Sequence, residues 1–286
     1  MNIKAKNFLD ECKMPSPLEG LNAVIQGLVE NPNTPMAKLT KFISMDPVLS
    51  ARIHKLANDA LNKSKHESGS LTKVITQLGL GKIRTLIQSN QSFISFSGEL
   101  SRYIKPEDFW QRALAVALCA QNIDQILGNN SEDIFCAGLL HDYGRLIILN
   151  NADKLPVLKL NKECRDKKAL VYKNERRFYG FNHMEVADAL FKEWDLPAVL
   201  REPAAYHHSP ILAVRHKYET SVVHIADIIC RSMKLGKSMD NFIPTLDMKA
   251  VNLVGLSPDQ LDYICEETTH DMEDYMKFLE HLQAAS

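Results

Sequence analysis

The sequence predicts an all-α protein in two helical lobes, and three features of its 286 residues support this fold class. Apolar residues recur at the i, i+3, i+4, i+7 spacing of a helix face, beginning with Leu21, Val24, Ile25 and Leu28. The 12 glycines and 12 prolines are few and scattered, which favours helices joined by short loops over a sandwich with many tight turns. The first third of the chain holds no alternating apolar and polar run of the kind that predicts a strand.

Proline and glycine mark the boundaries of the first helices. Thr34 is expected to cap a helix whose first residue is Pro35, because proline suits the first helical position. Asp46 and Pro47 repeat this arrangement and open the next helix. Gly79 interrupts the apolar stripe that follows, which predicts a pair of helices rather than one.

Further helical segments are readable after residue 105. They cover residues 108–127, 132–149, 153–178, 183–194, 197–207, 217–234 and 257–283. Asn182 is expected to cap the segment that starts at 183, since an asparagine side chain accepts hydrogen bonds from the first helical turn. The stretch 235–256 is less regular, and its Pro244 and Gly255 predict loops with short helices.

These changes of pattern divide the chain into three parts. Residues 1–104 are expected to form an N-terminal helical lobe, and residues 105–235 a second lobe. The two lobes should meet near residues 96–108. Residues 236–286 are expected to form a C-terminal helical extension that packs on the second lobe.

Composition excludes several classes of protein. Hydrophobic residues make up 45% and charged residues 24%, which is ordinary for a folded soluble domain and excludes a disordered or fibrous chain. The net charge of −1 excludes a globally basic nucleic-acid binder and leaves only a local basic patch open. No apolar run approaches the ~18 residues of a membrane span, and the N-terminus lacks the apolar core of a signal peptide. We therefore expect a cytoplasmic protein with no membrane partner, whose six cysteines are free thiols.

The stretch "GLLHDYGR", residues 138–145, carries the strongest chemical signal. His141 and Asp142 are expected in the middle of a helix among leucine and isoleucine neighbours. A carboxylate is costly to bury there unless it is paired or coordinates a metal. Ala137 and Gly138, one turn earlier, leave room for something to approach the helix. A His-Asp pair by itself is compatible with a purely structural role.

Three further motifs strengthen the metal interpretation. "FNHMEVADALFKEWDLP" puts His183 in the first turn of an amphipathic helix, and "YHHSP" puts His207 and His208 together at a helix end. "VVHIADIIC" places Asp227 in an apolar helix, one turn after a histidine. Imidazole and carboxylate groups are the ligands of zinc, iron and manganese sites. Each motif also has a structural explanation, as a helix-start hydrogen bond, a surface pair or a hydrogen-bonded carboxylate.

The order His-Asp, His, His-His and Asp resembles the metal-binding scheme of the HD superfamily of phosphohydrolases. The HDOD family of signalling proteins is the closer resemblance. Its N-terminal pattern is similar to "MPSPLEGLNAVIQGLVENP", "ISMDPVLSARIHKLAN" and "VITQLGLGKIRTL", and the likeness extends from about Met14 to Arg231. The resemblance implies that the second lobe is an HD-like helical bundle. It also implies one divalent metal (Zn, Fe, Ni or Mn), no organic cofactor, and the ligand set His141, Asp142, His183, His207, His208 and Asp227.

Arg112 departs from the HD pattern. Catalytic relatives begin their ligand set with a histidine early in the helix that here reads "FWQRALAVALCA". A guanidinium cannot lose its proton to coordinate a metal. It would repel a divalent cation ~4 Å away by about 8 kcal/mol at an effective dielectric constant of ~20. Arg112 must therefore point away, leave its half of the site without metal, or pair with Asp142 or Asp227 in place of the cation.

Two other departures concern the same site. Arg145 stands where the family has a lysine after the His-Asp pair; it could hold a phosphate by a bidentate contact or lie on the helix surface. Pro203 lies one turn before His207, and a proline inside a helix removes a hydrogen bond and clashes with the preceding turn. We expect it to displace the histidine pair from the family's geometry.

These residues favour a non-catalytic HDOD signalling module with a degenerate metal site, whose partner is a regulatory protein or a small phosphorylated ligand. The alternative is a metal-dependent phosphohydrolase acting on nucleotides or cyclic dinucleotides, so enzymatic activity stays open. Two-metal phosphate hydrolysis needs both ions to clamp the attacking and leaving oxygens, and the loss of one ligand argues against it. Nucleic-acid binding by the first lobe, through Lys73, Lys82 and Arg84, is disfavoured because so few basic residues are involved.

Overall fold

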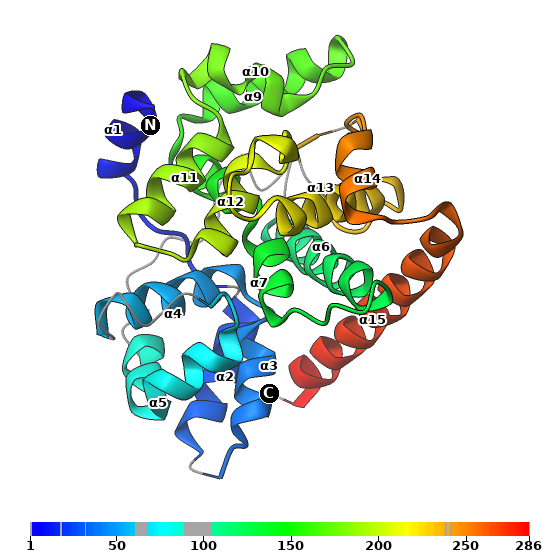
Figure 1. Cartoon of the computed structure of the whole chain (residues 1–286). Helices are drawn as coiled ribbons and strands as arrows, with labels where there is room; N and C mark the ends of the chain where they lie inside the picture. Colours follow the sequence, from blue (N-terminus) through cyan, green and yellow to red (C-terminus); the bar gives the residue numbers. More distant parts are fainter. Residues whose placement is uncertain are drawn as a thin grey trace.

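The computed structural model confirms the all-α prediction: the residues that it describes form helices joined by short loops, with no strand among them (Figure 1). It describes residues 2–17, 19–31, 33–60, 68–88, 105–237, 239–240 and 242–285. The helices are α1 (Ile3–Asp10), α2 (Glu19–Glu30), α3 (Met36–Ile43), α4 (Pro47–Ala60), α5 (Leu71–Gln88), α6 (Pro106–Ile126), α7 (Glu132–Leu140), α8 (Tyr143–Asn151), α9 (Lys154–Asp166), α10 (Val171–Tyr179), α11 (His183–Glu193), α12 (Ala198–Tyr206), the 3-10 helix η4 (Pro210–Leu212), α13 (Lys217–Ser232), α14 (Met248–Val254) and α15 (Pro258–Ala285).

Helices α2 to α5 pack against one another in the first lobe. Asp46 opens α4 as expected, because its Oδ1 accepts hydrogen bonds from the backbone N–H groups of Val48 and Leu49 at 2.7 and 3.0 Å. The predicted cap at Thr34 is wrong. Helix α3 begins one residue later than expected, and Pro35 takes the N-cap position in an extended conformation without a side-chain hydrogen bond.

Gly79 divides α5 into the predicted pair of helices. Its φ of 75° and ψ of 157° lie outside the helical region, in a conformation that glycine alone adopts readily. Beyond the kink, Arg84 donates from Nε and Nη2 to the carbonyl oxygen of Val29, at 3.2 and 2.7 Å. Arg84 therefore ties the second half of α5 to the end of α2.

Helix α6 is the centre of the second lobe. It is buried around most of its circumference, and α7, α13 and α15 pack against it. Alanines allow a close approach on one side: a Cβ added to Gly138 of α7 would lie 2.8 Å from the Cα of Ala117. The room that the sequence leaves beside His141 is thus filled by α6.

Two expected helices are each divided in two. Residues 132–149 form α7 and α8, and residues 153–178 form α9 and α10. Lys168 ends α9 with a φ of 52°, and the N–H of Ala169 returns to the carbonyl oxygen of Cys164 at 2.8 Å. A lysine in the left-handed region gives no sequence signal, because glycine or asparagine usually takes that position.

The two ends of the chain both contact the second lobe. Helix α1 lies against α11, where the rings of Phe8 and Phe181 are 4.8 Å apart between centroids. Helix α15 packs on α6 and also reaches α2 (Figure 1). The lobes touch where α4 and α5 contact α7, and residues 96–104, part of the expected meeting point, lie outside the described residues. No helix in the described part of the chain is long and apolar enough to cross a membrane.

Candidate metal centre

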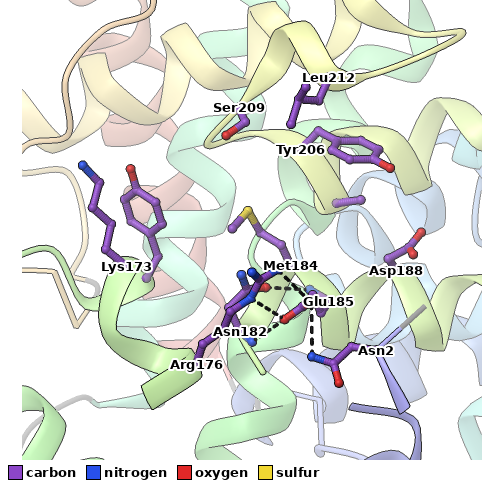
Figure 2. A pocket seen from close by; sticks show the side chains of 12 residues that line it. Asn2, Lys173, Arg176, Asn182, Met184, Glu185, Asp188, Tyr206, Ser209 and Leu212 are labelled. Atoms are coloured by element: carbon purple, nitrogen blue, oxygen red, sulfur yellow. Dashed lines mark hydrogen bonds and ion pairs between the residues drawn. The ribbon is translucent and has the colours of Figure 1, made fainter. Parts of the chain in front are cut away.

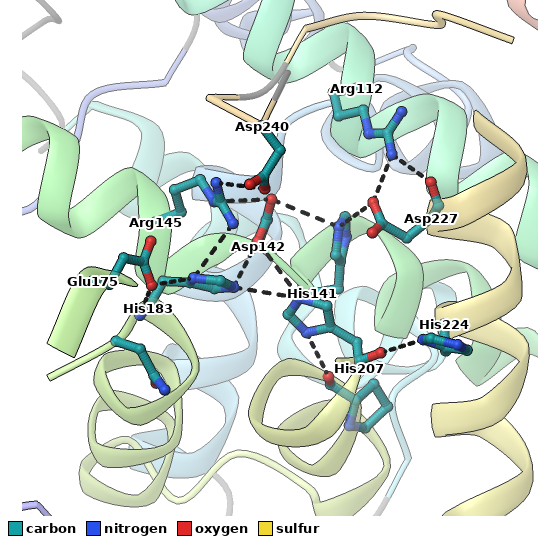
Figure 3. Close-up of polar contacts among 12 residues, drawn as sticks. Arg112, His141, Asp142, Arg145, Glu175, His183, His207, His224, Asp227 and Asp240 are labelled. Atoms are coloured by element: carbon teal, nitrogen blue, oxygen red, sulfur yellow. Dashed lines mark hydrogen bonds and ion pairs between the residues drawn. The ribbon is translucent and has the colours of Figure 1, made fainter. Parts of the chain in front are cut away.

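His141 and Asp142 lie in a break between α7 and α8, and their expected place in the middle of one helix is wrong. His141 is the C-cap of α7 and Asp142, with φ −99° and ψ 14°, is the N-cap of α8. Consecutive residues of an unbroken helix point about 100° apart. The break removes this constraint, and both side chains face the same buried cluster (Figure 3).

Gly144 brings the start of α8 against the start of α11. A Cβ at this position would lie 2.0 Å from the carbonyl oxygen of His183 and 2.7 Å from the backbone nitrogen of Ala187. Only a residue without a side chain allows the two backbones to approach this closely. The contact sets the distance between Asp142 and His183.

His183 is the first residue of α11 and is held from two directions. Asn182 caps the helix as predicted, and it forms a capping box with Glu185. Glu175 of α10 is buried, and its Oε2 accepts from the backbone N–H of His183 at 2.9 Å and from its Nδ1 at 2.7 Å. Because a carboxylate only accepts, Nδ1 carries the proton and Nε2 faces the cluster.

His207 and His208 end α12. His207 is fully buried, and its Nδ1 donates to the carbonyl oxygen of Pro203 at 3.1 Å. We expected Pro203 to displace the histidine pair, but His207 stays in the cluster. The carbonyl group of Pro203 instead orients the His207 ring. His208 is partly exposed, and the ring of Tyr172 stacks on it with 3.8 Å between centroids.

Asp142 is the centre of the cluster. Its Oδ1 lies 3.2 Å from His183 Nε2 and 3.7 Å from His207 Nε2. Its Oδ2 lies 3.9 Å from Nε2 of His141, whose Nδ1 donates to the carbonyl oxygen of Gly138 at 2.7 Å. His141, His183 and His207 therefore each use Nδ1 for a fixed acceptor, and Nε2 of His183 and His207 faces Oδ1 of Asp142 (Figure 3). Nε2 of His141 lies between two carboxylates, and it is closer to Asp227 Oδ1, at 3.5 Å, than to Asp142 Oδ2.

Asp227 is held by two arginines. Its Oδ1 accepts from Arg112 Nη2 at 2.6 Å, and its Oδ2 accepts from Arg231 Nε at 2.9 Å. Arg112 Nη2 also donates to the backbone carbonyl of Asp227, and all three side chains are almost fully buried. The sequence left three outcomes open for Arg112. The structure shows one of them, the ion pair with Asp227.

Arg145 is buried inside the cluster, which excludes the helix-surface position considered from the sequence. Its Nε lies 3.3 Å from Asp142 Oδ2, and its Nη1 lies 3.1 Å from Oδ2 of Asp240. Asp240 also accepts from Arg231 Nη1 at 3.0 Å. Cations and anions thus alternate through the lobe, in the order Arg112, Asp227, Arg231, Asp240, Arg145 and Asp142.

The pKa values of these groups follow from burial and neighbouring charge. Burial opposes ionisation of Asp142 and Asp227, but the guanidinium groups beside them outweigh it and hold both pKa values well below their usual range. Arg145 lowers the pKa of Asp142 more than any other neighbour does. The pKa of Asp227 is lowered most by Arg231, followed by Arg112. Burial, followed by the neighbouring histidines, places the pKa values of His207 and His208 well below the ordinary histidine value.

The residues form two overlapping sets that fit a metal ion. In one set the ligand atoms of His183, His207 and His208 lie within 4.8 Å of one another; in the other those of His141, Asp142 and His207 do. His141 Nε2, both Asp142 oxygens and His208 Nε2 meet no hydrogen-bond partner among the described residues, although they are buried. Buried acceptors of this kind fit a cation. Asp227 belongs to neither set, and arginines bind both of its oxygens.

Sequence reasoning missed three residues of this cluster. Glu175 and Arg231 both had a signal: Glu175 falls on the apolar stripe of α10 with Val171 and Phe178, and Arg231 lies one helical turn after Asp227. Asp240 follows α13 in an irregular stretch and had none. All three act on the predicted ligands, either directly or through Arg145.

A pocket of about 440 Å³ lies outside the histidines (Figure 2). Tyr172, which stacks on His208, is part of its wall, together with residues of α10, α11 and α12. Met184 and Tyr206 give it apolar surface, and Lys173 and Arg176 give it positive charge. Arg176 is bound to Glu185 at 2.9 Å, whereas Lys173 forms no ion pair with a described carboxylate.

Comparison with known proteins places the chain in a family. The HDOD domain matches residues 14–210. The chain is similar to the MmoQ response regulator of Methylococcus capsulatus, with a TM-score of 0.67 and 21% identity over 89% of this chain and 99% of that one. It is also similar to an HDOD domain protein of unknown function from Geobacter sulfurreducens, with a TM-score of 0.50 and 24% identity over 99% of this chain and 96% of that one. A provisionally named phosphohydrolase from Shewanella amazonensis has a TM-score of 0.52 and 21% identity over 98% of each chain. No curated protein matches. The HDOD match covers more than half of the sequence, and the chain therefore belongs to the HDOD family.

Proposed function

We propose that the protein is a non-catalytic HDOD signalling module whose degenerate HD centre holds at most one divalent cation. One observation carries this proposal: Arg112, at the position where the resemblance leads us to expect the first HD ligand, binds Asp227 at 2.6 Å. The ion pair is buried, with 4% and 2% of the two side chains exposed. It takes the place of a metal on this side of the cluster.

The geometry argues against hydrolysis by two metal ions. A two-metal site clamps both the attacking and the leaving oxygen of a phosphate, so it needs ligands for each ion. Arg112 cannot deprotonate, and with Arg231 it occupies both oxygens of Asp227. A cation near Asp227 would have to displace a guanidinium and would then face its charge.

The other side of the cluster suits one transition-metal ion. His183, His207 and His208 supply imidazole nitrogens and Asp142 supplies a carboxylate. Such a donor set favours zinc, iron or nickel, and accommodates manganese less well. When bound, the ion would polarise the oxygen of a ligand or a water molecule. Glu175 and the carbonyl of Pro203 keep the rings of His183 and His207 in place whether or not an ion is present.

In this proposal the guanidinium of Arg145 compensates the buried carboxylates of Asp142 and Asp240 and does not bind phosphate. Its Nε and Nη1 already face Asp142 and Asp240, and its side chain is 1% exposed. A phosphate contact would require it to leave these partners. We instead assign contact with a small phosphorylated ligand or a regulatory protein to the pocket beside His208, where Lys173 is accessible.

Metal content and phosphodiesterase activity test the proposal together. We would measure zinc, iron, nickel and manganese per chain by elemental analysis, and hydrolysis of bis-p-nitrophenyl phosphate, in the wild type and in Arg112→His. The wild type should bind at most one ion and show no turnover, and Arg112→His should bind more metal. Arg84→His, far from the cluster, is the matched control and should leave the metal content unchanged.

Two results would overturn the proposal. Two ions per wild-type chain would show that Arg112 does not exclude the first metal. Turnover by the wild type that is lost in both His141→Ala and Asp142→Ala would establish the alternative, a metal-dependent phosphohydrolase. The similarity to a provisionally named phosphohydrolase is what keeps that alternative in the test.

A further inference from the structure

A concentration of positive charge lies on α9 and α10, which the sequence analysis did not single out. Residues 154–177, here called the α9–α10 hairpin, contain nine lysines and arginines and three acidic residues, a net charge of +6. The whole chain carries −1, so the remaining residues carry −7. A nearly neutral protein therefore presents one strongly basic segment.

Few of these charges are neutralised. Lys167 and Arg177 pair with Glu163, and Arg176 pairs with Glu185. Of the other two acidic residues of the hairpin, Glu175 is buried against His183 and Asp166 is exposed at the end of α9. The other six basic side chains form no ion pair with a carboxylate of the described residues; they are Lys154, Lys159, Lys162, Arg165, Lys168 and Lys173.

Three of the six form a continuous row on α9. Lys159, Lys162 and Arg165 are all exposed, and with Leu158 and Asp166 they are the described residues that line a hollow of about 390 Å³. At ~1.5 Å of rise per residue, the row extends over about 9 Å of the helix. Phosphates of one strand of duplex DNA advance ~3.4 Å along the axis, so the row matches about three of them.

The hairpin is also accessible. Figure 1 shows α9 and α10 at one edge of the molecule and α15 at another. The exposed carboxylates of α15 include Asp259, Asp262 and Glu266. The acidic helix of the same chain therefore leaves the basic row open to a partner.

We propose that the α9–α10 hairpin binds the phosphodiester backbone of a nucleic acid without reading its sequence. Binding to a polyanion releases condensed counterions, so a few lysine and arginine contacts suffice for measurable affinity. Exposed ion pairs with protein carboxylates each contribute little, which disfavours an acidic protein as the partner.

A membrane is a weaker match to the same surface. Binding to an anionic bilayer needs apolar side chains beside the basic ones. Leu155, 60% exposed, is the one large apolar side chain of the hairpin that is strongly exposed among the described residues. On a flat anionic bilayer the rest of the chain, which is acidic, would also lie close to the lipid head groups and be repelled by their negative charge.

The contact should be independent of base identity. Tyr172 of α10, beside the exposed Lys173, is stacked on His208 with 3.8 Å between ring centroids and is not free to stack on a base. The metal centre is not involved, so the proposal does not depend on the proposed function.

Fluorescence anisotropy with two labelled probes tests the proposal. The probes are a 20-base-pair DNA duplex of random sequence and a 20-nucleotide single-stranded RNA, and their comparison shows which nucleic acid is preferred. The wild type should bind at least one of them in 50 mM salt. For three contacts to duplex DNA, the slope of log K against log salt should be about −2.7.

The variants locate the contact. Lys159→Glu/Lys162→Glu/Arg165→Glu should weaken binding at least ~10-fold in 50 mM salt. Lys38→Glu/Lys217→Glu/Lys249→Glu changes the net charge equally at exposed lysines elsewhere, and should change the affinity less than ~2-fold. The milder Lys159→Gln/Lys162→Gln/Arg165→Gln should also lose affinity and serves if the first variant does not fold.

Three outcomes would overturn the proposal. One is the absence of binding to both probes in 50 mM salt. Another is an equal loss in the hairpin variant and the charge-matched control, which would reflect net charge rather than this site. In the last outcome the protein binds phosphatidylcholine vesicles that contain phosphatidylserine but binds neither nucleic acid. That result would show that the basic surface binds membranes.

Discussion

The guanidinium of Arg112 and the carboxylate of Asp227 form a buried ion pair 2.6 Å long between residues 115 positions apart in the sequence. The pair joins α6 to α13 and compensates the buried charge of Asp227. In the proposed function it stands where a metal ion would otherwise be held, so the pair is both a structural contact and the basis of that proposal.

Removing this guanidinium should destabilise the fold. Arg112→Ala leaves Asp227 with one arginine, and breaking a buried ion pair costs ~3–5 kcal/mol. Urea unfolding in the presence of a chelator measures this loss. Arg177→Ala removes an exposed pair with Glu163 and should leave the free energy of unfolding almost unchanged. Equal losses in the two variants would contradict a structural role for Arg112.

Glu175 should orient His183 for metal binding. Glu175→Gln removes a charged acceptor from both the backbone N–H and Nδ1 of His183, and such changes lower metal affinity about 10–100-fold. Competition with a zinc chelator measures the affinity. Glu163→Gln, on the neighbouring helix, is the control and should leave zinc affinity unchanged. A normal affinity in Glu175→Gln would mean that packing alone holds the ring.

Gly144 should tolerate no side chain. In Gly144→Ala the new Cβ would meet the backbone of His183 at 2.0 Å, so α8 and α11 must separate. We expect a loss of about 3 kcal/mol or more in the free energy of unfolding, the upper end for overpacking. Gly27→Ala is the control: it lies within α2 with nothing within 4 Å, and should stabilise the protein by ~0.5–1 kcal/mol.

Acidification should destabilise the metal-free protein. Burial lowers the pKa values of His207, His208 and His224, so these rings stay neutral in the folded state while the unfolded chain takes up protons below about pH 6.5. Stability is thus fully present above the unfolded pKa and falls with pH. Asp142 and Asp227 have lowered pKa values, so their contribution to stability is fully present above about pH 4 and is lost only below it, outside this range.

The urea midpoint measured in a chelator at pH 7.5 and 5.5 checks this sign. It should be lower at pH 5.5. His208→Gln should show a smaller decrease, because one of the three titrating rings is absent. A midpoint that rises on acidification would exclude these histidines as the dominant influence in that range.

Local patterns determined the helices and most of the candidate ligands. The cap at Asn182 and the start of α4 after Asp46 depend on residues within one turn, so spacing alone predicts them. The candidate histidine and aspartate ligands were predictable from the resemblance to HD proteins and from polar residues on apolar helix faces, which need an interior partner. The same resemblance left the pairing of Arg112 with Asp142 or Asp227 as one of three outcomes.

Tertiary packing decided the rest of the centre. The break between α7 and α8 depends on how Asp142 meets α11, and the end of α9 depends on a left-handed lysine. Asp240 joins Arg145 from 95 positions away in a stretch without periodicity. Local spacing does not encode such contacts, because they form only when distant helices bury charged groups together and each group requires a partner.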